Sequence, residues 1–146
     1  MVLTLFGIFA VCMLTILLTG AKVYSRLIER GNASYDMRTC AQYIAARVRQ
    51  ADSLGAIATG DFYGSDALIF DDGSGYLTRV YCYDGYISEL YSAKDKEMKP
   101  EDGEKIIKAE QMTVNADGQL LTVQVKDSNG RENKLYLSLR SEGGTR

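Results

Sequence analysis

The first 21 residues contain no charged side chain, although the chain of 146 residues has 17 basic and 19 acidic ones. Eleven of these 21 are Val, Leu, Ile or Phe, and each favours insertion near a helix centre by about 0.3 to 0.6 kcal/mol. A helix of this length spans roughly 32 Å, close to the roughly 30 Å hydrocarbon core of a bilayer. We therefore predict one transmembrane helix over residues 1–21. Its expected membrane and assembly contacts are Leu5, Phe6, Phe9, Leu14 and Leu17.

A cleavable signal peptide is the alternative interpretation of this segment. Thr19 and Ala21 are small residues of the kind that precede a cleavage site. However, no basic residue precedes the apolar run, and the run exceeds the roughly 7 to 15 residues usual for signal peptides. These features favour a permanent anchor.

The composition of the whole chain excludes several kinds of chemistry. It contains no His, so His-dependent nucleophile systems and His-ligated metal sites are excluded. A net charge of -2 is too balanced for a general nucleic-acid binder. No Gly-rich phosphate loop opens a helix, and no carboxylate pair is marked for acid–base catalysis. We expect no enzyme activity, cofactor, metal or small-molecule substrate. A cation site at Asp61, Asp66, Asp71 and Asp72 is a weaker alternative to turns.

Residues 22–53 are predicted to form an amphipathic helical stem. The Gly31-Asn32 pair predicts a break or a kink, because Gly costs about 1 kcal/mol inside a helix. A second helical run is expected from Ser34 to a stop at Gly55. Its apolar side chains recur at helical spacing and form one stripe, which includes Met37, Cys40, Ile44 and Val48.

Residues 54–140 are predicted to form an antiparallel sheet of five to seven strands, followed by a flexible tail over residues 141–146. Asp84-Gly85 favours a tight hairpin turn between residues 76–83 and 86–91. Apolar and polar residues alternate over 121–126 and 134–140. The fold class is thus α+β, with the helical stripe packed on one sheet face. The residues expected to make this packing are Met37, Cys40, Ile44, Val48, Leu121, Val123 and Leu137.

Two further segments have alternative interpretations. Residues 94–104 include eight charged residues and the single Pro. This composition favours a solvated loop, and an interaction loop is the second interpretation. The three cysteines leave at least one unpaired, namely Cys12. A Cys40–Cys82 disulfide across the helix–sheet interface is one alternative, and two buried free thiols are the other.

Three stretches, residues 5–27, 43–52 (YIAARVRQAD) and 80–91 (VYCYDGYISELY), resemble a family of Gram-positive bacterial proteins known as domain of unknown function 4860. The layout of a membrane helix that continues into an amphipathic helix on a sheet also resembles type IV pilins and pseudopilins. One departure is at the N-terminus: prepilins have a basic leader and usually a Glu five residues after the cleavage Gly, whereas Cys12 follows Gly7 here.

The resemblance implies a minor pseudopilin-like subunit of a secretion, competence or pilus-type assembly, with the bilayer and other pilin-like subunits as partners. The alternative is a single-span membrane protein whose β-rich head binds a ligand or partner. Lys22, Arg26 and Arg30 follow the apolar segment, so the positive-inside rule places the head in the cytoplasm. The resemblance instead implies a head outside the cell membrane.

Overall fold

The computed structural model describes residues 1–52, 57–139 and 144–145. It forms two compact units, Met1–Tyr35 and Asp36–Arg146. Among the described residues one α-helix is present, α1 (Val2–Asp52), and it contributes to both units.

The first unit consists of the N-terminal part of α1. Val2–Ile28 contains an 18-residue stretch with a mean hydropathy of 2.5, none of which is buried, and the segment is long and apolar enough to cross a membrane. The structure therefore agrees with a single-pass anchor. Of the two outcomes expected at Gly31-Asn32, the break does not occur, because the backbone is helical throughout this region. One Gly lowers helix stability by about 1 kcal/mol, which is too little to interrupt a helix with several turns on each side.

The second unit contains the C-terminal part of α1 and two β-sheets. Sheet A has the strand order β5-β4-β3-β2-β1-β9, and sheet B has the order β6-β7-β8. In sheet A these strands are β1 (Ile57–Phe62), β2 (Ser65–Asp71), β3 (Tyr76–Tyr83), β4 (Tyr86–Ala93), β5 (Glu104–Lys108) and β9 (Gly144–Thr145). In sheet B they are β6 (Gln111–Asp117), β7 (Leu120–Lys126) and β8 (Glu132–Ser138).

The strands follow one another as hairpins because short turns connect most of them. Asp84 and Gly85 join β3 to β4 with positive φ angles of 51° and 75°, the backbone conformation of the predicted tight turn. All pairs are antiparallel except β1 with β9. Because β9 lies in the expected flexible tail, that part of the tail is a strand.

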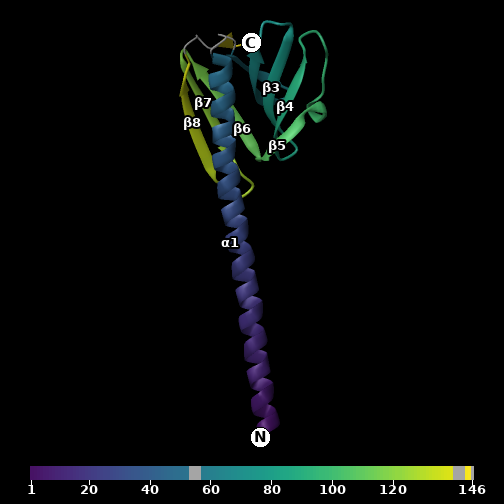
Figure 1. The fold of residues 1–146 in the computed structure, drawn as a ribbon, viewed down its shortest axis with the longest axis vertical. Helices are drawn as coiled ribbons and strands as arrows, with labels where there is room; N and C mark the ends of the chain where they lie inside the picture. The colour runs from purple at the N-terminus through teal and green to yellow at the C-terminus, as the bar shows by residue number, and fades with distance from the viewer. Residues whose placement is uncertain (53–56, 140–143, 146) are drawn as a thin grey trace. The chain divides into compact units, whose positions relative to one another are not determined.

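The main core lies between α1 and both sheets, and Figure 1 shows the C-terminal part of α1 passing over β6 and β7. Sheet B has an alternating pattern along β7, where Leu121 and Val123 are fully buried. Sheets A and B are also joined by a hydrogen bond of 3.0 Å from the Val114 amide to an Asp66 carboxylate oxygen. The helix–sheet packing thus uses two sheets with nine described strands, where one sheet of five to seven strands was expected.

Candidate functional site

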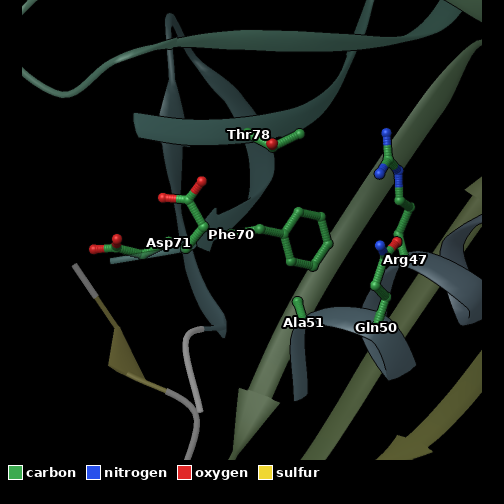
Figure 2. A pocket seen from close by; sticks show the side chains of 7 residues that line it. Arg47, Gln50, Ala51, Phe70, Asp71 and Thr78 are labelled. Carbon is green, nitrogen blue, oxygen red and sulfur yellow. The ribbon is translucent and has the colours of Figure 1, made fainter. Parts of the chain in front are cut away.

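A small hollow lies within the second unit, where the last turns of α1 face the ends of β2 and β3 (Figure 2). Its volume is about 140 Å³, and the Phe70 ring points from β2 toward the helix residues. The lining residues are Arg47, Gln50, Ala51, Phe70, Asp71, Asp72 and Thr78. Sites for drug-sized ligands occupy about 300 to 1,000 Å³, so this hollow fits only an ion, a few waters or one group of a larger ligand.

The charged groups around the hollow already have partners in the chain. Lys94 Nζ lies 2.6 Å from a carboxylate oxygen of Asp71. Asp72 accepts hydrogen bonds from the amide and the hydroxyl of Ser74, and these bonds lower the pKa of Asp72. The acidic residues here thus form a turn at the end of β2 and an ion pair beside it.

Arg47 connects the hollow to a polar cluster between α1 and β4. Its guanidinium forms an ion pair with both carboxylate oxygens of Glu89, with 3.0 Å between Nε and Oε2. The Tyr43 hydroxyl donates to the same carboxylate, and the Arg47 guanidinium lies 5.8 Å from the Tyr43 ring centre. This cluster attaches the polar edge of the helix to sheet A.

The electrostatics of Glu89 reflect two opposing influences. Burial raises the pKa of Glu89, and the like charge of Glu104, its cross-strand neighbour on β5, adds to the increase. The Arg47 guanidinium and the Tyr43 hydroxyl favour the ionised carboxylate, since both donate hydrogen bonds to it. Loss of these donors would therefore raise the pKa of Glu89 further.

Sequence analysis did not identify this cluster. It assigned no partner to Arg47, because that partner lies 42 residues later on β4. The available signal was that residues 43–52 and 80–91 carry the family resemblance. Tyr43 and Arg47 lie in the first stretch and Glu89 lies in the second.

The residues predicted for helix–sheet packing all lie in one buried cluster. Cys40, Ile44, Leu121 and Val123 are at most 1% exposed. The cluster includes all seven of the predicted residues: Met37, Cys40, Ile44, Val48, Leu121, Val123 and Leu137. The predicted stripe therefore packs against sheet B, and the same cluster extends to sheet A through Leu68, Val80 and Ile87.

The three cysteines are free thiols, so the structure contains no Cys40–Cys82 disulfide. Both thiols are buried in the main core, and the Cys82 thiol donates to the Ala109 carbonyl over 3.3 Å. Burial raises the pKa of the Cys40 thiol to about 12, and Cys82 adds to the increase. Burial also raises the pKa of the Cys82 thiol. Both thiols are therefore less acidic than an exposed cysteine and pack as small apolar side chains.

The expected membrane and assembly residues are all exposed and far from the hollow in sequence. Their side chains lie on the apolar part of α1 with exposed fractions between 59% and 73%. They are Leu5, Phe6, Phe9, Leu14 and Leu17.

The four aspartates considered for a cation site accept hydrogen bonds from backbone amides. Asp61 accepts from the Gly64 amide at 3.1 Å, and Asp66 accepts from Val114 on β6. In the part of the chain that the structure describes, no group of three or more acidic or cysteine side chains is arranged to hold a metal ion.

The charged loop over residues 94–104 is part of the fold, which sequence analysis missed. Met98 packs on a second cluster formed by Ala67, Tyr81 and Leu90. The Tyr81 hydroxyl donates to the Pro100 carbonyl at 2.7 Å, and a Cβ at Gly103 would collide with that hydroxyl. The loop therefore covers the face of sheet A opposite the helix.

Comparisons with known proteins gave one match. The profile of the family described as Domain of unknown function (DUF4860) matches residues 35–128, well over half of the chain. This range includes the Tyr43–Arg47–Glu89 cluster and most of the core. No curated protein and no solved structure matches the chain. The chain therefore belongs to the family Domain of unknown function (DUF4860).

Proposed function

We propose that this protein is a non-enzymatic, membrane-anchored, pilin-like subunit of a bacterial secretion, competence or pilus-type assembly. The observation that carries the proposal is the exposed apolar part of α1. An 18-residue stretch of Val2–Ile28 has a mean hydropathy of 2.5 and buries nothing in the chain's own fold. Such a helix suits lipid, and it equally suits a bundle of related helices.

The layout of the chain supports the same proposal. One uninterrupted helix, α1, includes both the apolar segment and the stripe that packs on antiparallel strands. This order of elements resembles that of type IV pilins and pseudopilins. The partners in the proposal are the bilayer and other pilin-like subunits.

The proposal places the head outside the cell membrane. This orientation follows from the pilin-like layout. The positive-inside rule, applied to Lys22 and Arg26, would instead place the head in the cytoplasm. Protease added to intact protoplasts should then remove the residues after Arg30. Complete protection of the head would contradict this orientation.

The second candidate is a membrane-tethered head that binds a ligand or partner. The hollow beside Arg47 favours it, as do the stacked rings of Tyr76 and Tyr91, whose centres are 5.2 Å apart. Both rings are exposed, and Tyr91 pairs across the strands with Thr78 of the hollow. The volume of about 140 Å³ is small for a ligand site, which is why the assembly role ranks first.

Replacing residues 2–21 with an unrelated apolar membrane helix separates the two candidates. An assembly subunit should lose function, because specific helix packing is lost while the head stays intact. A binding module should retain function, since its helix serves only as an anchor. Retained secretion or DNA uptake with the foreign helix would contradict the assembly role.

A further inference from the structure

A shallow apolar hollow runs along one side of α1 within the first unit. Its lining consists of Thr15, Ile16, Thr19, Gly20, Val23, Tyr24 and Leu27. The Thr15 hydroxyl donates to the Val11 carbonyl and the Thr19 hydroxyl to the Thr15 carbonyl, each at 2.8 Å. Because both threonine hydroxyls bond to the helix itself, neither of them requires a polar partner in the hollow.

Two exposed basic side chains border this hollow. Lys22 and Arg26 are one turn apart, and they come seven and eleven residues after Thr15. At 3.6 residues per turn these spacings are about two and three full turns, so both basic residues share a helix face with Thr15. Val2–Ile28 contains no acidic residue, and the following Glu29 and Arg30 cancel each other in charge.

We propose that this hollow and the Lys22–Arg26 pair bind one anionic phospholipid, with phosphatidylglycerol as the probe. The phosphate lies between the two basic side chains, and one acyl chain lies in the hollow toward Thr15. The proposal rests on membrane insertion of α1, which belongs to the proposed function, but it does not require assembly.

Two arguments favour a lipid over a second copy of the helix. The first is charge complementarity: a second copy would bring another Lys22 and Arg26 to the same place in a parallel pair, and like charges repel. The second is length. Arg26 lies about 16 Å along the axis from Thr15 at about 1.5 Å per residue, close to half of the roughly 30 Å hydrocarbon core. One acyl chain of a single leaflet covers that distance.

The test is native mass spectrometry of the full chain released from nanodiscs that contain equal amounts of phosphatidylglycerol and phosphatidylcholine. The wild-type monomer should retain phosphatidylglycerol in preference to phosphatidylcholine. Each basic side chain near an anionic bilayer contributes about fivefold to affinity, so Lys22→Gln with Arg26→Gln should lower the preference about 30-fold. The exchange Lys22→Arg with Arg26→Lys should preserve it.

Two further variants separate this site from general charge and from helix content. Lys96→Gln with Lys134→Gln removes the same charge from exposed positions of the head and should leave the lipid preference unchanged. Gly20→Leu fills the hollow without a clash, since nothing lies within 4 Å of a Cβ there, and should reduce retention of both lipids.

Three outcomes would overturn the proposal. One is equal retention of the two lipids by the wild-type chain, and another is an equal loss of preference in both charge variants. The third is a lipid-free dimer as the main species, which would assign the hollow to a second copy. The lipid site can be correct even if the assembly role is wrong. That result would be a protein that retains its function with the foreign helix, while the wild-type chain still prefers phosphatidylglycerol.

Discussion

Two parts of the same helix differ in how apolar side chains are distributed around it. In the first part Leu5 and Leu14 are 73% and 59% exposed, and apolar residues occur on all sides. In the second part Cys40 and Ile44 are 0% and 1% exposed, and apolar residues form one stripe. The comparison teaches that the angular distribution of apolar residues, more than their number, predicts whether lipid or protein surrounds a helix.

The largest effect is expected from a substitution in the buried part of α1. Ile44→Ala should lower the free energy of unfolding by about 2 to 5 kcal/mol, because it removes apolar contacts and leaves a cavity. Leu14→Ala, the matched change on the exposed side, should leave the unfolding of the head within about 0.5 kcal/mol of wild type. Urea denaturation of the full chain in detergent, followed by tyrosine fluorescence, measures both.

A control in the sheet completes this experiment. Thr122 alternates with the buried Leu121 and Val123 on β7 and is half-buried. Thr122→Ala should therefore change the unfolding free energy by no more than about 0.5 kcal/mol. Equal losses for Ile44→Ala and Thr122→Ala would mean that the faces of helix and sheet are wrongly assigned.

The second prediction concerns a charge placed in the exposed apolar part of α1. Leu14→Asp places a charge near the centre of the apolar segment, which costs about 2.5 to 3.5 kcal/mol on the insertion scale. The protein should shift from the carbonate-resistant membrane fraction to the soluble fraction, and its assembly function should be lost. Urea denaturation of the head should remain as in wild type. A stable membrane fraction with intact function would contradict the role of this segment.

The third prediction concerns the polar cluster that attaches the buried part of α1 to sheet A. Glu89→Leu removes the acceptor for Arg47 and Tyr43 and should lower the unfolding free energy by about 1 to 3 kcal/mol. The value is moderate because the Arg47 side chain is 37% exposed and can be solvated. A double-mutant cycle with Arg47→Met should give a coupling of about 1 kcal/mol. A coupling near zero would reduce the cluster to a surface contact.

The smallest expected effect is the change in stability for each unit of alkaline pH. The pKa of Cys40 is raised from 9.0 to about 12 in the folded chain, so the unfolded thiol ionises first as pH rises. Unfolding free energy should therefore fall above about pH 9, by at most about 1.4 kcal/mol for each pH unit. Cys40→Ala should have a shallower decrease than wild type when denaturation is measured at several alkaline pH values. Parallel curves for the two proteins would contradict the burial of this thiol.

Local patterns predicted the parts of the fold that local physics controls. The strand at β3 has the predicted bounds, because the Asp84-Gly85 turn fixes where it ends. The buried stripe of α1 was also predicted from its spacing alone. The division into two sheets was not, since Asp66 bonds to Val114 over 48 residues and nothing local indicates that pairing.

The candidate site was less predictable than the fold. The hollow depends on the approach of Phe70 to the end of α1, and Arg47 meets Glu89 across 42 residues. The contribution of the charged loop was hidden for another reason. Residues 94–104 contain eight charged residues, and this composition is typical of a solvated loop. The position of the loop is instead determined by the packing of Met98 and by the hydrogen bond from the Tyr81 hydroxyl.

The order of elements along α1 and sheet B also affects how the protein is made. Ile44 is synthesised about 77 residues before Leu121, which packs in the same core. At about 5 to 20 residues per second, the ribosome takes about 4 to 15 s to cover that interval. During this time the apolar stripe has no sheet B to cover it. A nascent chain that stops before β7 can cover the stripe with sheet A alone and leaves its contacts with Leu121 and Val123 unmade. Such truncated products should therefore be removed quickly by chaperones and proteases.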